Sequence, residues 1–125
     1  ESRAYYVPVA HSYLGVGKQV ALEDALKAIE KIFQAKVIGQ NLKFDLSLLY
    51  DRYNFTRKNV YADTMIMAWL LDSSSKVGLD VLAKRYFDYE MKSFKDIVRK
   101  GEDFSSVDIK DASFYASEDA WMSLK

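Results

Sequence analysis

The chain has 125 residues, of which half are hydrophobic and 29% are charged, and this composition is typical of a globular domain rather than of a disordered segment. Its formal net charge is zero, which argues against a broad basic surface for tight, sequence-independent binding of duplex DNA. The chain has no cysteine and only one histidine, His11, so disulfides, thiolate zinc sites and multi-histidine metal sites are excluded.

The predicted elements alternate between strands and helices in the first half of the chain and are mainly helical in the second half. In chain order we expect a strand at 4–8, a loop at 11–19, a helix at 22–34, a strand at 36–39, a helix at 42–53, a strand at 59–62, helices at 64–71 and 79–87, a short helix at 94–98 and a last helix at 110–124. This order indicates an α/β or α+β fold in one domain.

One predicted helix differs from the others in its pattern. Residues 64–71 are apolar on nearly all sides, which predicts a helix buried in the core. The longest apolar run, residues 65–71, is too short to cross a bilayer, so we expect no membrane span. Together with the absence of cysteine, this favours a cytoplasmic location.

Two aspartates lie on the apolar faces of predicted helices. Asp45 falls on a line with Leu42 and Leu46, and Asp119 shares a face with Tyr115. An ionised carboxylate that faces a core is costly unless a cation meets it, and carboxylate oxygens are ligands that suit Mg²⁺ or Mn²⁺. Two such residues on separate helices therefore predict a shared metal site of the kind that supports phosphoryl chemistry. The alternative is that each aspartate pairs with a lysine or arginine.

Four further polar residues have a structural explanation beside a functional one. Tyr115 could orient a metal-bound water, although a core tyrosine with a satisfied hydroxyl is the default for a chain with nine tyrosines. Asn41 precedes a helix and Asp63 lies between a strand and a helix, so capping a helix N-terminus is the favoured role of both. His11 stands alone in a predicted loop, which favours a structural role.

The arrangement of these residues resembles a known family. Residues 37–49, with the run Gly-Gln-Asn-Leu-Lys-Phe-Asp, resemble the second motif of the proofreading 3′–5′ exonuclease domains of family A bacterial DNA polymerases, the DNA polymerase I family. Residues 115–119, Tyr-Ala-Ser-Glu-Asp, resemble the third motif of the tyrosine subtype within the DEDD exonuclease superfamily. Residues 6–13, 63–65 and 79–86 are also similar to this family.

The resemblance implies a fold, a reaction and partners. The fold is the ribonuclease H-like exonuclease fold, an α/β fold with a mixed sheet flanked by helices, and it forms a single domain over residues 1–125. The reaction is hydrolysis of the 3′-terminal phosphodiester of DNA with two Mg²⁺ or Mn²⁺ ions. The partners are the single-stranded 3′ end of DNA and a polymerase domain of the same polypeptide.

The resemblance also implies roles for individual residues. Asp119 is implied to bind the metal that activates water, Asp45 to support the second metal through water, and Tyr115 to orient the nucleophile. The implied substrate-binding residues are Gln40, Asn41, Lys76 and Phe94. Lys76 stands where relatives often have an arginine, so it keeps the charge but loses bidentate geometry.

The first motif of the family, Asp-x-Glu on the opening strand, has no counterpart before Asn41. Because its carboxylates normally bridge the two metals, Asp45 and Asp119 alone would supply too few ligands for a tight paired site, and we expect impaired cleavage. We expect the chain to be a fragment of a longer polymerase without the first two strands, so that a strand at 4–8 lacks its neighbour. Two alternatives stay open: an inactive exonuclease-like scaffold domain, and an RNA-trimming nuclease of the ribonuclease D type.

Overall fold

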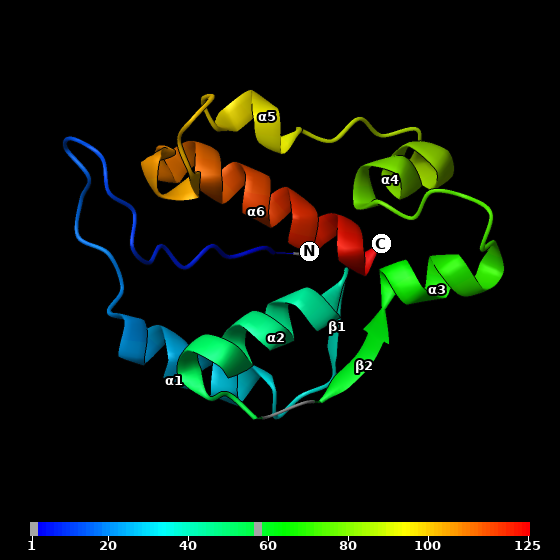
Figure 1. Cartoon of the computed structure of the whole chain (residues 1–125), viewed down its shortest axis with the longest axis horizontal. Coiled ribbons are helices and arrows are strands. Elements are labelled where there is room, and N and C mark those ends of the chain that lie inside the picture. The colour runs from blue at the N-terminus through cyan, green and yellow to red at the C-terminus, as the bar shows by residue number, and fades with distance from the viewer. Residues whose placement is uncertain (1–2, 57–58) are drawn as a thin grey trace.

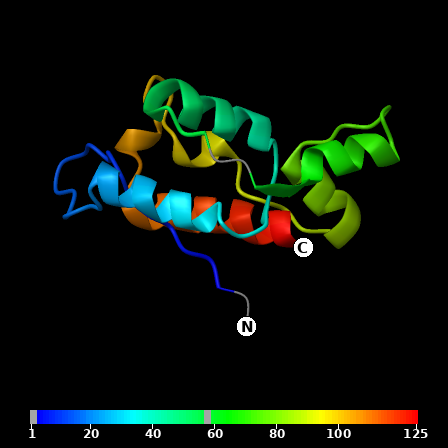
Figure 2. The same cartoon turned by 90° about the horizontal axis from the view of Figure 1, so that it is seen from below.

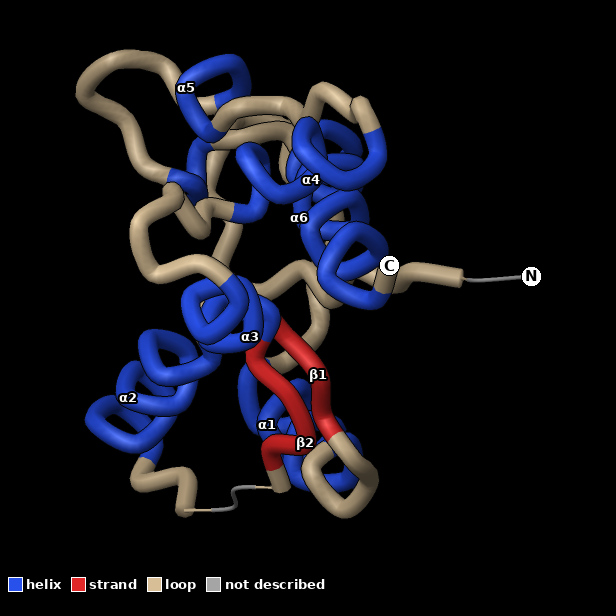
Figure 3. The backbone as a smooth tube through the Cα atoms, turned by 90° about the vertical axis from the view of Figure 1, so that its right-hand side faces the viewer, coloured by secondary structure: helices blue, strands red, loops and turns tan. Residues whose placement is uncertain are grey.

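The computed structural model describes residues 3–56 and 59–125. In chain order its elements are α1 (Leu22–Ile32), β1 (Val37–Gly39), α2 (Leu42–Tyr53), β2 (Val60–Asp63), α3 (Thr64–Leu71), α4 (Leu79–Phe87), α5 (Phe94–Ile97), the 3₁₀ turn η1 (Phe104–Ser106) and α6 (Ile109–Leu124). The strands lie with α1 and α2 in one part of the molecule, and α4, α5 and α6 form the other part (Figures 1 and 3). This mixed α/β architecture agrees with the predicted class, and all the predicted helices are present.

The strands β1 and β2 form a small parallel sheet. Val37 pairs with Val60 and Gly39 pairs with Asp63, with an irregularity in the register directly after Val37. Parallel neighbours need a crossover connection, and α2 provides it, so β1, α2 and β2 form a βαβ unit. The sheet in the described residues is parallel throughout, and the mixed sheet implied by the resemblance is therefore not seen in them.

The strand predicted at 4–8 is not formed in the described part of the chain. This prediction was wrong because a strand needs a neighbour, and Pro8 has no N–H to offer one. The first described residues project from the body of the molecule (Figure 2). The segment is held instead through His11, which donates from Nδ1 to the carbonyl of Val107 (3.0 Å) and accepts at Nε2 from the hydroxyl of Tyr6 (2.5 Å). These bonds confirm a structural role for His11.

The prediction that residues 64–71 form a buried helix was wrong in its burial. The helix is present as α3, but Ala68 is its one buried residue, and Leu71 is 78% exposed. Its other exposed large side chains are Ile66, Met67, Trp69 and Leu70. The helix lies at the edge of the molecule in Figures 1 and 2, so no second layer covers it in the described residues. Within those residues, moreover, no helix has the length and apolar character needed to cross a bilayer.

Asp63 joins the sheet to two helices. It is the last residue of β2 and is 7% exposed, and its Oδ1 accepts from the backbone N–H groups of Met65 (2.9 Å) and Ile66 (3.4 Å) at the start of α3. The same carboxylate accepts from the N–H groups of Asn41 (3.1 Å) and Leu42 (2.8 Å) at the start of α2. One side chain thus satisfies the unpaired N–H groups of both helices, which confirms capping as its role.

The prediction that the Asn41 side chain caps α2 was wrong. Asn41 occupies the N-cap position, but its side chain makes no capping hydrogen bond, and the N–H of Phe44 donates to the backbone carbonyl of Asn41 instead (2.9 Å). Its backbone is left-handed (φ 58°), a conformation that asparagine tolerates better than most residues. The turn also depends on Gly39, where an added Cβ would lie 2.6 Å from Cδ2 of Leu42.

We expect Asp63→Ala to lower the free energy of unfolding by about 2–4 kcal/mol, because it removes the caps of two helices and leaves buried N–H groups unpaired. Urea unfolding followed by circular dichroism measures this change. The matched control is Asp51→Ala, at an exposed position of α2, for which we expect a change within about 0.5 kcal/mol. Equal losses for the two variants would contradict the double-capping role.

Candidate functional site

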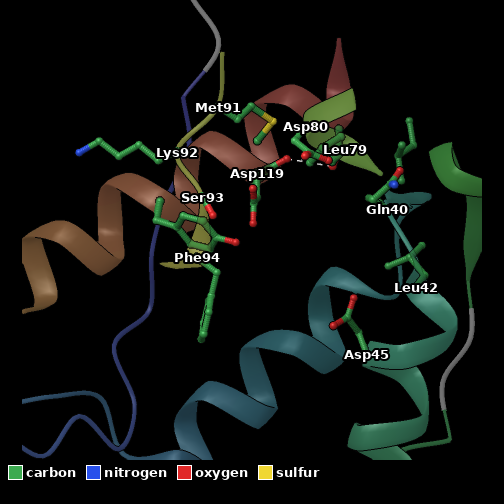
Figure 4. Close-up of a pocket in the computed structure, with 15 residues that line it drawn as sticks. Gln40, Leu42, Asp45, Leu79, Asp80, Met91, Lys92, Ser93, Phe94 and Asp119 are labelled. Atoms are coloured by element: carbon green, nitrogen blue, oxygen red, sulfur yellow. Dashed lines mark hydrogen bonds between the residues drawn. The ribbon is translucent and has the colours of Figure 1, made fainter. Parts of the chain in front are cut away.

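A cavity of about 640 Å³ lies between α2, α4, α5 and α6 and includes the end of β1 (Figure 4). Its lining comes from segments that are far apart in the chain. The lining residues are Ile38, Gly39, Gln40, Leu42, Asp45, Leu79, Asp80, Met91, Lys92, Ser93, Phe94, Tyr115, Asp119, Ala120 and Ser123. The structure therefore brings together Asp45, Tyr115, Asp119, Gln40 and Phe94, all of which the sequence analysis selected.

The two aspartates reach the cavity from opposite sides. Asp45 extends from α2, one turn after the start fixed by Asp63, and Asp119 extends from α6 (Figure 4). Asp119 is half-buried, whereas Asp45 is exposed at the cavity. The prediction that Asp45 faces a packed core was therefore wrong, because the residues along its side of α2 border an open space.

Neither aspartate has a basic partner in residues 3–56 and 59–125. The ion pairs of this part of the chain are formed by Lys27 and Lys84 with other acidic residues. The alternative in which a lysine or arginine neutralises Asp45 and Asp119 is thus not observed there. The same residues also contain no cluster of three acidic or histidine side chains arranged to hold a metal ion. The roles of Asp45 and Asp119 as metal ligands stay predictions.

Burial governs the protonation of both aspartates. Burial raises the pKa of Asp119 to about 6, the negative charge of Glu118 adds to this rise, and the hydroxyl of Tyr115 opposes it. Loss of hydration next to the protein also raises the pKa of Asp45, with a further contribution from the charge of Asp63. Ionisation of these two carboxyls is therefore less favourable in the cavity than in water, and a bound cation would offset this cost.

Tyr115 lies one helical turn before Asp119 and also lines the cavity. Burial raises the pKa of its hydroxyl, and the nearby charge of Asp119 raises it further. The hydroxyl therefore keeps its proton at neutral pH. A protonated phenol can donate one hydrogen bond and accept another, but it cannot act as a base.

Phe94 lies at the start of α5, lines the cavity and is 48% exposed as a residue. The ring is stacked on Phe104, with centroids 6.2 Å apart and planes at 15°, and it meets the edge of Tyr115 at 6.4 Å and 69°. The aromatic neighbours support one side of the ring, and the exposed part is free to meet a ligand.

The other predicted substrate-binding residues are less well placed. Gln40 lines the cavity, but its side chain donates to the carbonyl of Val77 (2.8 Å) and accepts from the hydroxyl of Thr64 (2.5 Å). Asn41 and Lys76 are exposed and are not among the residues that line the cavity. The structure thus assigns Gln40 a bridging role between three segments, and it leaves substrate contacts by Asn41 and Lys76 as predictions.

Sequence reasoning missed Asp80 and Glu118. Asp80 lines the cavity from the first turn of α4, and its charge contributes to the raised pKa of Tyr115. Glu118 is 7% exposed and binds the segment before α5, so it supports the cavity wall from behind. Asp80 lies within residues 79–86, which resemble the family, and Glu118 directly precedes Asp119 in the third motif. Their positions in these two runs are the sequence signal that could have identified them.

Residues 3–125 match the family model described as 3′–5′ exonuclease. The chain belongs to this 3′–5′ exonuclease family. It is 35% identical over 121 residues to DNA polymerase I of Borreliella burgdorferi (96% of this chain, 13% of the relative) and 33% identical over 133 residues to that of Pseudomonas aeruginosa (100% and 15%). Over 87 residues it is 36% identical to DNA polymerase I of Treponema pallidum (67% and 9%).

These matches confirm the resemblance to the 3′–5′ exonuclease domain of DNA polymerase I. The chain spans only 13% and 15% of the length of the first two polymerases it matches. The matched region includes Asp45, Tyr115 and Asp119, so the cavity residues belong to the part of the chain that the exonuclease family model covers.

We expect Asp119→Asn to make the chain more stable than the wild type at about pH 7.5, by about 1 kcal/mol after allowance for partial exposure of the carboxyl. The substitution is expected to stabilise the protein because the pKa of Asp119 is about 6 in the folded state, against its ordinary value of 3.8. Ionisation of the folded protein therefore costs stability as the pH rises through 6, and protonation below about pH 4 removes the difference.

Urea unfolding of both proteins at about pH 7.5 and pH 4 tests this expectation. Asp111→Asn, an exposed position in the first turn of α6, is the control and should show no such pH-dependent gain. A gain for Asp119→Asn that is the same at both pH values would contradict the proposed burial of this charge.

Proposed function

We propose that this exonuclease domain removes nucleotides from the 3′ end of a DNA strand by metal-dependent hydrolysis, as part of a longer DNA polymerase. The observation that carries the proposal is the shared cavity, which is faced by Asp45 and Asp119 from separate helices and bordered by Tyr115 and Phe94. Membership of the 3′–5′ exonuclease family and the similarity to DNA polymerase I support it. The product would be a nucleoside 5′-monophosphate.

The donor set of the cavity fits a hard divalent cation such as Mg²⁺ or Mn²⁺. Asp45 and Asp119 offer carboxylate oxygens, and neither forms an ion pair within the described ranges that would compete with the cation. Asp119 would bind one ion directly, and Asp45 would support a second one through water. Bound ions supply an activated water and stabilise the charge that develops on the phosphate. Two aspartates are too few for a tight pair, so we propose that carboxylates elsewhere in the protein complete the site.

The other cavity residues hold the substrate. The Tyr115 hydroxyl, which stays protonated at neutral pH, would orient the attacking water by hydrogen bonding. The exposed part of the Phe94 ring would stack on the terminal base, since stacking on an aromatic side chain is independent of base identity.

We further propose that the complete domain has the ribonuclease H-like fold. The βαβ unit and the helix α6, which carries two of the site residues across from α2, support this assignment. Strands from a preceding segment would extend the small sheet beyond its present two.

Two alternatives remain testable. An inactive scaffold has no physical need for two aspartates that face a cavity and form no ion pair within residues 3–56 and 59–125, so their presence favours an enzyme. A ribonuclease D-like activity would use the same residues on RNA, and the substrates in the experiment separate it from the DNA activity.

We expect Asp119→Ala and Asp45→Ala each to lower exonuclease activity by about 100-fold or more, because each removes an oxygen ligand of the cation. The assay compares a 3′-mismatched DNA primer with an RNA strand, in Mg²⁺ or Mn²⁺, using both this chain and a longer form that includes the preceding acidic motif. The control is Asp111→Ala on the exposed side of α6. Full activity in both cavity variants would overturn the site, and faster cleavage of RNA would favour the ribonuclease.

We also expect the affinity of the 125-residue chain for Mn²⁺ to fall as the pH drops below about 6, because protons then compete with the metal for Asp119. Electron paramagnetic resonance of free Mn²⁺ measures the bound fraction. Asp119→Asn should bind more weakly at neutral pH and should lose most of this pH dependence. An unchanged pH dependence in that variant would show that another group binds the metal.

A further inference from the structure

The segment between α4 and α5 forms one wall of the cavity. Met91, Lys92, Ser93 and Phe94 all line it, yet residues 88–93 belong to no helix or strand. Irregular backbone without a support would move easily, and a mobile wall could not hold a nucleotide in one place.

Glu118 supplies such a support from behind the wall. It lies on α6 next to Asp119 and is 7% exposed, so its charge has been taken largely out of water. Its Oε1 accepts from the hydroxyl of Tyr89 (2.7 Å), and its Oε2 accepts from the backbone N–H of Lys92 (2.9 Å). Both hydrogen bonds hold the same segment, and charge-assisted bonds of this kind are stronger than neutral ones.

The restraint reaches Phe94 through two adjacent residues. The N–H of Ser93, directly after Lys92, donates to Oδ2 of Asp96 (2.9 Å), and the Ser93 side chain accepts from the N–H of Lys95, which together form a capping box. The first turn of α5, which begins with Phe94, is therefore fixed to the end of the segment that Glu118 holds. On its other side, the ring of Phe94 is fixed by Phe104 and Tyr115.

Tyr89 completes the arrangement. Its ring packs on Trp121 of α6, with centroids 5.7 Å apart and planes at 66°, while its hydroxyl donates to Glu118. The segment is thus attached to α6 by two hydrogen bonds to Glu118, by the ring contact of Tyr89 with Trp121, and by the ammonium of Lys92 over the ring of Phe114 (4.7 Å).

We propose that Glu118 is a positioning residue that, through Tyr89 and Lys92, holds the 89–94 wall so that Phe94 stacks on the terminal base of the strand. This inference rests on the proposed function, since it assumes that the cavity binds a strand end. Glu118 itself faces away from the cavity and touches no reacting group. It contributes to the affinity for the substrate.

The test uses the 125-residue chain and a single-stranded DNA that carries 2-aminopurine at its 3′ end, with Ca²⁺ in place of Mg²⁺ to prevent cleavage. Quenching of 2-aminopurine reports stacking of the terminal base, and titration gives the affinity. The main variant is Tyr89→Phe, which keeps the ring and the charge of Glu118 and removes one hydrogen bond. Phe94→Ala, the double variant and Glu118→Gln complete the set. Tyr86→Phe, on the exposed side of α4, is the matched control.

We expect Tyr89→Phe to weaken DNA binding by about three- to ten-fold and to reduce the quenching of 2-aminopurine. Glu118→Gln should weaken DNA binding at least as much. In the Phe94→Ala background, Tyr89→Phe should change affinity by less than about two-fold, because the two residues act through the same contact. A purely structural role would lower thermal stability without this dependence on Phe94. Circular dichroism verifies that each variant is folded, and Tyr89→Phe decides the outcome if Glu118→Gln does not fold.

The outcomes separate this inference from the proposed function. If the wild type binds and Phe94→Ala weakens binding, but Tyr89→Phe binds like the Tyr86→Phe control, the positioning role is overturned and the function stands. Independent, multiplying effects of Tyr89→Phe and Phe94→Ala also overturn it. If the 125-residue wild type does not bind the strand, the same titrations are made with the longer form that includes the preceding acidic motif. If that form does not bind either, the proposed function is overturned, and the positioning role with it.

Discussion

The carboxylate of Asp63 is the interaction on which the rest of the structure depends. Four backbone N–H groups, two from α2 and two from α3, donate to this one side chain at the end of β2. Because helix N-termini carry partial positive charge, they stabilise a buried carboxylate that two of them share, and no basic side chain in the described part of the chain forms an ion pair with it. This contact fixes where α2 begins relative to the sheet, and Asp45 follows within the first turn of that helix. The position of one candidate metal ligand is therefore set by a residue that does not enter the cavity.

Two faces of helix α6 contact different parts of the molecule. Tyr115 and Asp119 lie one turn apart and face the cavity, while Glu118 and Trp121 face the segment before α5. Since adjacent residues on a helix point about 100° apart, one short run can present candidate site residues to the cavity and hold the segment before α5 at the same time. The charge of Glu118 also contributes to the raised pKa of Asp119, so the two tasks are coupled electrostatically.

The sequence was sufficient for the features that depend on local pattern. Helical periodicity placed α1, α2, α4 and α6, and the spacing of the motifs selected Asp45, Tyr115 and Asp119, which the structure brings to one cavity. It was insufficient where a partner decides the outcome. The apolar pattern of α3 predicts burial, but burial requires a covering element that the pattern cannot supply. At the start of α2, the carboxylate that accepts from the N–H groups of Asn41 and Leu42 belongs to Asp63, which is distant in sequence. Glu118 was missed because its two partners come from a segment with no periodicity.

The acidic lining of the cavity affects how a cation and an anionic strand would bind there. Asp45, Asp80 and Asp119 line the cavity, whereas Lys92, the one basic residue of the lining, places its ammonium over the ring of Phe114, 4.7 Å from the centroid, and points away from them (Figure 4). A polyanion approaching that space meets repulsion until cations enter, and cations in turn are held more firmly once an anion is present. By thermodynamic reciprocity each ligand must raise the affinity for the other by the same factor. Under the proposed function, the binding of a cation and the binding of an anionic strand at this cavity would therefore strengthen each other.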